Sequence, residues 1–181
     1  MTLPMSAALP HRPSWAFMRA HLSRWIAMGA GAGLSPVAPG TMGTLLAWLL
    51  FVLLQAWITP WVGAMFLLLG LPIGWWACTR CAQDLALADP GCIVWDEIWA
   101  FALILLIIMP ASWQMQLLAF AVFRFFDAAK PQPVRWADRA FKGTGWRGGF
   151  GIMFDDIVAA FCSLLVLALL QYGLTLYGLA L

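Results

Sequence analysis

The chain has 181 residues, of which 64% are hydrophobic and 10% are charged, and it carries 12 tryptophans. Soluble domains contain about 25% charged residues, so this composition excludes an ordinary soluble protein and indicates a surface that faces lipid. The net charge of +2, with basic residues interleaved among acidic ones, argues against a nucleic-acid partner. The length predicts one domain, residues 1–181.

The first predicted element, residues 14–28, is an amphipathic helix. Its aromatic and aliphatic residues alternate with Arg19, His21 and Arg24, a pattern typical of helices that lie in the membrane interface. The same charges interrupt any apolar stretch long enough for a secretion signal, so no cleavage is expected.

A loop rich in glycine, proline and hydroxyl residues precedes the first membrane helix. Within it, Ser35, Thr41 and Thr44 can either cap that helix or donate hydroxyl groups to a phosphate, since helix N-termini attract anions. Capping is the simpler interpretation for Thr41. Two membrane helices are predicted next, at residues 42–58 and 61–79, separated by Thr59-Pro60.

The next uncharged stretch, residues 98–123, is interrupted by Met109-Pro110. A proline removes a helix hydrogen bond and restricts the residue before it, so the stretch forms either one broken span or a helical hairpin. We favour the hairpin, with helices at residues 93–109 and 112–129. A last span at residues 157–176 makes five crossings, with four as the alternative.

The charged residues indicate how the helices are oriented. All 18 Asp, Glu, Lys and Arg residues fall in residues 12–24, 80–97 and 124–156, and the hairpin places these three windows on one side of the membrane. Because Lys and Arg concentrate on the cytoplasmic side, that side is expected to be the cytoplasm. The predicted fold is an all-α, polytopic bundle of four to five membrane helices, with an N-terminal interfacial helix and cytoplasmic active-site loops.

The spacing of Cys78 and Cys81 matches a C-x-x-C motif, which occurs in zinc and redox sites. A zinc site needs further Cys or His ligands nearby, and the two histidines, His11 and His21, lie far away in the sequence. We therefore expect free thiols in or beside a helix end.

Two pairs of adjacent acids, Asp96-Glu97 and Asp155-Asp156, stand inside apolar runs. An Asp near the centre of a membrane helix costs about 2.5 to 3.5 kcal/mol, so something must compensate these charges. Adjacent residues point about 100° apart on a helix, which lets each pair serve two neighbours. Oxygen ligands without histidine or cysteine favour magnesium over zinc. Alternatively, each pair marks a solvated helix N-terminus.

Between the two acid pairs, Lys130-Pro131-Gln132-Pro133 leads to Arg135. The prolines stiffen this segment, which favours Lys130, and next Arg135, as phosphate ligands. Arg139, Lys142 and Arg147 are better explained by attraction to anionic lipid headgroups. The glycine-rich residues 143–151 form either a loop that offers backbone amides to phosphate or a flexible connection.

Taken together, four ordered motifs resemble the phosphatidylglycerophosphatase A family. They are residues 39–44 (PGTMGT), 93–97 (IVWDE), 123–127 (FRFFD) with 130–133 (KPQP), and 148–156 (GGFGIMFDD). The resemblance implies a bacterial membrane enzyme that uses magnesium to convert phosphatidylglycerophosphate to phosphatidylglycerol and phosphate. It also implies functional roles for Thr41, Asp96, Glu97, Asp127, Lys130, Asp155 and Asp156.

From the residues and the resemblance we predict a magnesium site formed by a subset of Asp96, Glu97, Asp155 and Asp156. The predicted catalytic residues are Asp96, Asp127, Lys130 and Asp156, and the predicted phosphate ligands are Ser35, Thr41, Lys130 and Arg135. The nucleophile is either water or an aspartate such as Asp127. The expected partners are the lipid substrate and membrane lipids, the expected location is the bacterial inner membrane, and the oligomeric state stays open.

A small cation transporter with a carboxylate site at the cytoplasmic face is the alternative function. A transport pathway predicts acids distributed through the depth of the membrane. In this sequence the acids cluster near one face and accompany Lys130 and a glycine-rich segment, which favours phosphate chemistry.

Overall fold

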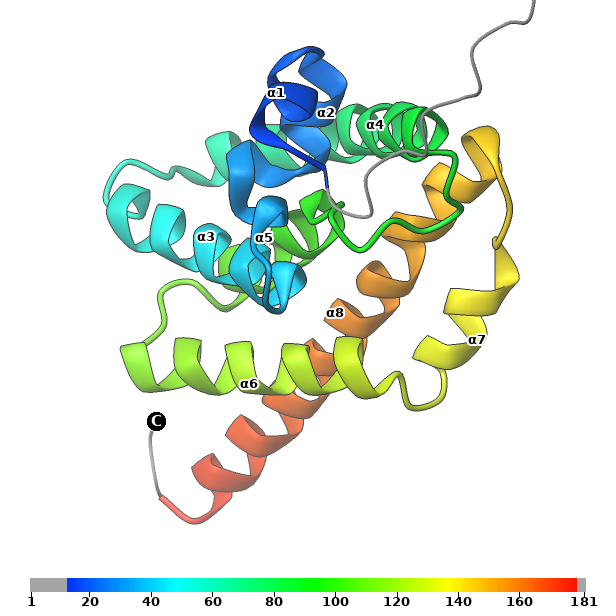
Figure 1. Ribbon diagram of the computed structural model, residues 1–181. Helices are drawn as coiled ribbons and strands as arrows, with labels where there is room; N and C mark the ends of the chain where they lie inside the picture. The colour runs from blue at the N-terminus through cyan, green and yellow to red at the C-terminus, as the bar shows by residue number, and fades with distance from the viewer. Residues whose placement is uncertain (1–12, 179–181) are drawn as a thin grey trace, which may run out of the picture.

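The computed structural model describes residues 13–178, and every regular element in this range is helical. The helices pack around a central α5, which is crossed by the long α8, while α6 lies along one side of the bundle (Figure 1). The elements are α1 (Trp15–Arg19), α2 (Leu22–Ala27), the 3-10 helix η1 (Gly29–Leu34), α3 (Pro39–Leu54), α4 (Pro60–Leu85), α5 (Trp95–Ile108), α6 (Trp113–Ala129), α7 (Val134–Ala140) and α8 (Gly145–Leu176).

The predicted all-α class is confirmed for the described residues. Helices α3, α5 and α6 lie close to their predicted positions, whereas α4 extends to Leu85 instead of residue 79 and α8 begins at Gly145 instead of residue 157. Thr59 caps α4 through its side chain and Pro60 is the first helical residue, as expected for a break at Thr59-Pro60. The interruption at Pro110 separates α5 from α6, and Ser112 caps α6 in the same way as Thr59 caps α4. The hairpin interpretation therefore describes this part of the chain.

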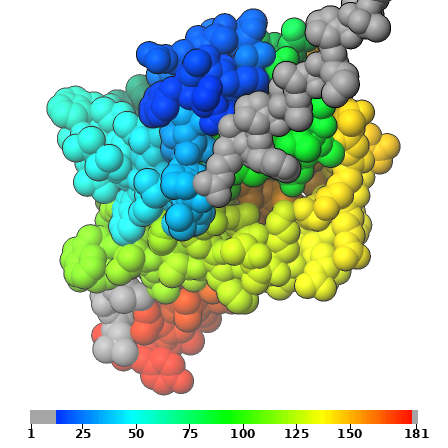
Figure 2. Space-filling model, in the orientation of Figure 1, coloured from blue at the N-terminus to red at the C-terminus, as the bar shows by residue number. Residues whose placement is uncertain are grey.

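Within residues 13–178, two helices are long and apolar enough to cross a membrane, namely α4 and α8. Helix α3 is apolar but shorter, and α5 and α6 have 14 and 17 residues, fewer than the roughly 20 that span hydrocarbon. The exposed large apolar residues are spread over α3, α4 and α8, and the C-terminal end of α8 projects beyond α6 (Figure 2). These surfaces suit a lipid environment.

The N-terminal segment differs from the single amphipathic helix that we expected over residues 14–28. It forms two short helices, α1 and α2, because the chain leaves helical geometry at His21, which adopts an extended conformation. Met18 is fully buried, whereas Trp15, Leu22 and Trp25 are exposed. Arg12, which begins the first charged window, and His11 lie outside the described residues.

Small residues bring the helices into close contact. At Gly31 (φ +114°) an added Cβ would meet the ring of Trp15, and at Gly29 (φ +54°) it would lie 2.9 Å from the side chain of Val94. These two glycines therefore allow the chain to bend and the helices to pack closely.

The four cysteines are free thiols, as expected for Cys78 and Cys81. Both of these lie inside α4 and are completely buried, so they belong to the packing of the bundle.

Candidate functional site

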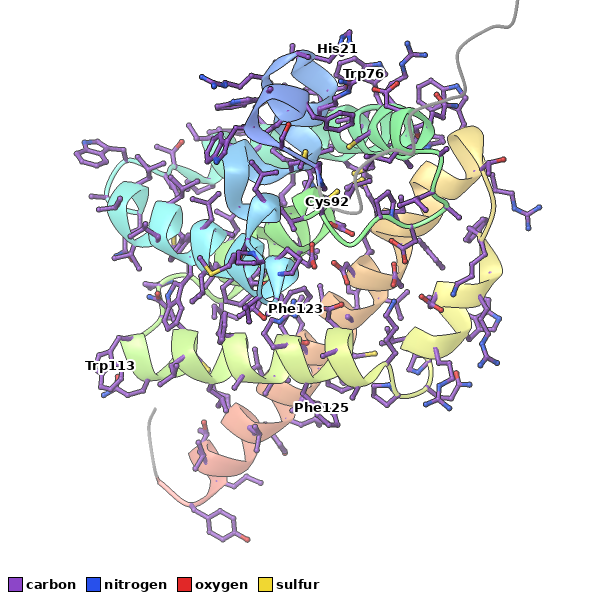
Figure 3. All side chains as sticks on the ribbon, in the orientation of Figure 1. His21, Trp76, Cys92, Trp113, Phe123 and Phe125 are labelled. Atoms are coloured by element: carbon purple, nitrogen blue, oxygen red, sulfur yellow. The ribbon has the colours of Figure 1, made fainter. Side chains whose placement is uncertain are left out.

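Three carboxylates from two helices converge in the interior of the bundle. Asp96 and Glu97 belong to the first turn of α5, and Asp156 lies in α8. One oxygen from each lies within 4.8 Å of the others. In Figure 3 the oxygen atoms of several side chains gather between the start of α5 and α8. We call Asp96, Glu97 and Asp156 the carboxylate cluster.

Each member of the carboxylate cluster has a buried oxygen without a hydrogen-bond partner among the described residues: Asp96 Oδ1, Glu97 Oε2 and Asp156 Oδ2. Unpaired buried charge is costly, and several carboxylates repel one another at this distance. Three hard oxygen donors within 4.8 Å of one another fit the ligand preference of Mg²⁺. The donor set therefore fits a divalent cation, which would remove both the repulsion and the unpaired acceptors.

Hydrogen bonds from one backbone N–H group and two indole N–H groups hold the first turn of α5 in place. The backbone N–H of Val94 donates to the carbonyl of Ala27 at 2.9 Å, which fixes the entry to the helix. The indole N–H groups of Trp95 and Trp99 donate to the carbonyls of Gly70 and Leu67. These bonds set the rotation of α5, so that Asp96 and Glu97 point toward α8.

A glycine makes room for Glu97. An added Cβ at Gly40, in the first turn of α3, would lie 3.1 Å from Glu97 Cδ. Few residues other than glycine can occupy this position without displacing the carboxylate. The PGTMGT motif thus contributes a backbone that closely approaches the carboxylate cluster.

Arg124 connects the carboxylate cluster to Asp127. Its Nη1 forms an ion pair with Asp127, one turn further along α6, and lies 4.0 Å from Glu97 Oε1. The same nitrogen donates to the buried hydroxyl of Thr44 at 3.4 Å. Arg124 was not among the predicted site residues, although its spacing of three residues from Asp127 on a helix is a signal for such a pair.

Lys130 occupies a second polar centre beside the first. Its Nζ lies 2.6 Å from Asp138 Oδ1 and 2.6 Å from Asp155 Oδ2. The residue caps the C-terminus of α6 in a left-handed conformation (φ +44°), which turns the chain toward α7. Asp155 therefore pairs with Lys130, while its neighbour Asp156 points into the carboxylate cluster.

These ion pairs control protonation in this second centre. Burial disfavours the charged form of Lys130, but the hydrogen bonds to Asp138 and Asp155 outweigh burial and raise the lysine pKa above its usual value. Burial likewise opposes ionisation of Asp138, yet Lys130 and Lys142 lower the pKa of that carboxyl below its usual value. Lys130 is consequently a cation, and Asp138 an anion, over the whole physiological pH range. Asp138 was missed because only the fold brings it to Lys130.

The structure does not bring all the predicted phosphate ligands to the carboxylate cluster or to Lys130. Ser35 donates its hydroxyl to the carbonyl of Val37, within its own turn. Thr41 lies in the first turn of α3 and does not cap it, because Ala38 is the N-cap residue. The prediction that Thr41 caps this helix is therefore wrong. Arg135 is exposed on α7, whose buried residues are Val134 and Ala137.

Most of residues 143–151 form a helix rather than the predicted loop. Helix α8 begins at Gly145, and the carbonyl of Trp146 accepts a hydrogen bond from the indole of Trp75 at 2.6 Å. An added Cβ at Gly149 would lie 2.8 Å from Thr79 Cα. Gly149 therefore lets α8 touch α4, whereas an added Cβ at Gly151 would meet Phe141.

Helix α6 separates the polar interior from the outside. Phe123 is fully buried and points into the bundle, whereas Phe125 points away from it (Figure 3). Arg124 and Asp127 follow on the inner side of the same helix, where their side chains are mostly buried.

Comparison of the chain with a family model and with two known proteins points to the same family. The family model described as phosphatidylglycerophosphatase A matches residues 25–171. The chain is 39% identical over 147 residues to phosphatidylglycerophosphatase A of Haemophilus influenzae, covering 81% of this chain and 87% of the relative. It is 41% identical over 142 residues to phosphatidylglycerophosphatase A of Escherichia coli, covering 76% and 77%.

A third relative carries a different name. The chain is 35% identical over 153 residues to a protein of Bacteroides thetaiotaomicron named putative phosphatidylinositol-3-phosphatase, covering 81% of this chain and 92% of the relative. No solved structure matches the chain.

Proposed function

Since this chain belongs to the phosphatidylglycerophosphatase A family, we propose that it removes the terminal phosphate of phosphatidylglycerophosphate. The products are phosphatidylglycerol and inorganic phosphate, which makes the chain a phosphoric monoester hydrolase. The carboxylate cluster is the observation that supports this proposal most strongly. Its three buried oxygens have no hydrogen-bond partner among the described residues. Such a cluster is better suited to binding a cation than to stabilising the fold by itself.

Asp96, Glu97 and Asp156 would hold magnesium in this proposal. When bound, a magnesium ion supplies positive charge to phosphate oxygens and lowers the pKa of water. Asp155, a predicted ligand, instead positions Lys130, so the Asp155-Asp156 pair divides between the two polar centres.

Lys130 and Arg124 supply the positive charge that this chain itself contributes. Lys130 is held between two carboxylates and stays protonated, so it can bind the phosphate dianion and stabilise the charge that develops during transfer. Arg124 orients Asp127 beside Glu97. Asp127 is thereby placed either to accept a proton from attacking water or to attack directly.

The location of the two centres suits a lipid whose headgroup lies at the membrane surface. The polar groups lie at the start of α5, the end of α6 and the first half of α8, beside apolar surfaces of α3 and α4. All 10 Lys and Arg residues fall in the same three charged windows, which supports a multi-pass protein of the bacterial inner membrane with its site on the cytoplasmic face.

A cation transporter is not favoured. The acids of the carboxylate cluster lie together and beside two cationic side chains, and they are not distributed along the length of the helices. A phosphate ester requires such cations, whereas a cation pathway is hindered by them.

The direct test measures phosphate release by the purified protein in detergent micelles. Phosphatidylglycerophosphate is supplied with magnesium or with chelator, and a phosphatidylinositol 3-phosphate is the comparison substrate because of the name of the third relative. Release from the first lipid that chelator abolishes and magnesium restores is expected. Equal release with chelator would refute the metal requirement, and no release from folded, magnesium-supplied protein would refute the proposed activity.

Replacing Lys130 with methionine should lower activity about a hundredfold or more and also lower thermal stability, because Asp138 and Asp155 lose their shared partner. Lys142→Met is the matched control. Among residues 13–178 its amine pairs with Asp138 alone, at 2.9 Å, and its side chain is 62% exposed, so its removal should change activity less than threefold. Equal effects in both variants would show that Lys130 has no particular role.

A further inference from the structure

Thr44 is a fully buried residue of α3 to which the proposed chemistry gives no part. Its hydroxyl donates to the carbonyl of Gly40, one turn earlier in the same helix, at 3.0 Å. A hydroxyl group has a single hydrogen, so this bond leaves only the acceptor lone pairs for other groups. Thr44 therefore cannot donate to a phosphate or to a carboxylate while this bond is intact.

The acceptor side of the Thr44 hydroxyl meets Arg124. The Nη1 atom of Arg124 donates to Thr44 Oγ1 at 3.4 Å, and it also donates to Asp127 on its own helix. This nitrogen carries two hydrogens, and the two bonds use both of them. Glu97 Oε1 lies 4.0 Å from the same nitrogen, which is too far for a hydrogen bond. Arg124 is thus bonded to Asp127 and Thr44, while it only approaches Glu97.

Glu97 is the natural competitor for Arg124, because a guanidinium forms strong hydrogen bonds with carboxylates. Both side chains lie close to the first turn of α3, where a Cβ added at Gly40 would be 3.1 Å from Glu97 Cδ and 3.4 Å from Arg124 Nη1. Glu97 Oε2 has no hydrogen-bond partner among the described residues. A small movement of Arg124 would bring it into direct contact with Glu97, and this carboxylate would then be less available to a cation.

We propose that Thr44 is a positioning residue that holds Arg124 toward Asp127 and thereby leaves Glu97 free to bind the cation of the carboxylate cluster. This inference rests on the proposed function, which assigns that cation to the cluster. Residues that orient the groups around metal ligands change metal affinity by about 10- to 100-fold. Thr44 acts through Arg124 and is not itself a ligand.

A purely structural role for Thr44 would be to join α3 to α6. Other contacts already join these helices, because the indole N–H of Trp48 donates to Gln116 Oε1 at 2.8 Å and the rings of Trp48 and Phe120 are stacked. These contacts involve no charged side chain. Gln116→Met therefore weakens the link between α3 and α6 without removing a bond of Arg124, and it separates the structural role from the positioning role.

Magnesium affinity tests the proposal without any need for turnover. Thr44→Val removes the acceptor and keeps nearly the same shape. Isothermal titration calorimetry of the purified protein in detergent should show that this variant binds magnesium on the order of tenfold more weakly than the wild type. Thr44→Ser retains the hydroxyl and should bind magnesium like the wild type. An unchanged affinity in Thr44→Val would overturn the proposal.

Thr79→Val is the matched control. Thr79 is also buried, and its hydroxyl donates to the carbonyl of Trp75, one turn earlier, at 2.7 Å. Within residues 13–178, no charged side chain donates to this hydroxyl. Thr79→Val and Gln116→Met should lower the unfolding midpoint and keep the magnesium affinity of the wild type. A tenfold loss of affinity in either control would overturn the proposal, because lost stability alone would then explain the effect of Thr44→Val.

Arg124→Met shows whether Thr44 acts through Arg124. Without the guanidinium, magnesium should bind at least as tightly as in the wild type, and the addition of Thr44→Val should weaken binding no further. An equal loss from Thr44→Val with and without Arg124 would overturn the proposal. Weaker magnesium binding in Arg124→Met alone would also overturn it, even if Thr44→Val did not fold.

Phosphate release from phosphatidylglycerophosphate is measured on the same samples. Absence of release from proteins that show the expected magnesium affinities would refute the activity alone and leave the role of Thr44 intact. A folded wild type that binds no magnesium would refute the metal site and this role with it. Loss of release in Thr44→Val at unchanged magnesium affinity would show that the hydroxyl acts on the substrate instead.

Discussion

Asp156→Asn is expected to reduce phosphate release on the order of a thousandfold while leaving the fold intact. Asp156 contributes one of three unpaired oxygens to the carboxylate cluster, and asparagine retains its shape with one anionic charge removed. A cation held by two acids instead of three binds more weakly and is positioned less well, so both magnesium affinity and turnover should fall.

The same variant should have an unusual effect on thermal stability. In the absence of metal, Asp156→Asn relieves repulsion among three buried acids, so its unfolding midpoint should exceed that of the wild type. Magnesium should raise the midpoint of the wild type, since a ligand that binds only the folded state stabilises it, but should scarcely affect the variant. Differential scanning fluorimetry in detergent, with magnesium or chelator, measures both effects.

Asp84→Asn is a suitable control for this experiment. Asp84 already pairs with Arg24 at 2.9 Å and lies outside the carboxylate cluster, so its loss should preserve the response to magnesium. An Asp156→Asn protein that keeps the full magnesium shift would show that the cluster is not the metal site.

The second large effect is on stability and concerns the contact of α8 with α4. Gly149→Ala should destabilise the protein by about 3 kcal/mol, because the new Cβ would lie 2.8 Å from Thr79 Cα and one helix would have to move. For a chain of this size that corresponds to a fall in the unfolding midpoint of about 10 °C.

Gly173→Ala offers a control in the same helix. An added Cβ at Gly173 meets nothing within 4 Å, and alanine favours helix over glycine by about 0.5 to 1 kcal/mol. Its midpoint should stay equal or rise slightly, when measured by circular dichroism in the same detergent. Similar midpoints for the two variants would mean that α4 and α8 do not approach as closely as the structure shows.

Features of the fold that depend on local sequence could be predicted well. Pro60 and Pro110 lie at helix boundaries, so the end of α3, the start of α4, the end of α5 and the start of α6 could be predicted from residue type. Pro72, by contrast, lies inside α4 without ending it. The division of the N-terminal segment at His21 could not be predicted, because the alternation of apolar and basic residues continues through it; the structure shows His21 extended and Met18 buried.

The site residues show the same division between local and tertiary information. The pair Asp96-Glu97 stood out because acids are costly in an apolar run, and the structure brings both to Asp156. The contacts of Lys130 and Arg124 with residues of other helices could not be predicted. Asp138, Asp155 and Thr44 become their neighbours only through the packing of α3, α6, α7 and α8.

The glycine-rich segment before Asp155 was misread for a related reason. A run of glycines permits both a mobile loop and a close helix contact, and the sequence contains nothing that distinguishes them. The deciding factor is the opposing surface of α4 at Thr79, which belongs to a distant part of the chain.

The split of the carboxylate cluster between α5 and α8 has a consequence for biosynthesis. A nascent chain emerges from the ribosome N-terminus first, so Asp96 and Glu97 are made well before Asp156. Truncated translation products that stop before α8 therefore contain two of the three acids and cannot form the cluster. With the role proposed for the cluster, activity toward membrane lipids is confined to chains in which α8 has joined the bundle.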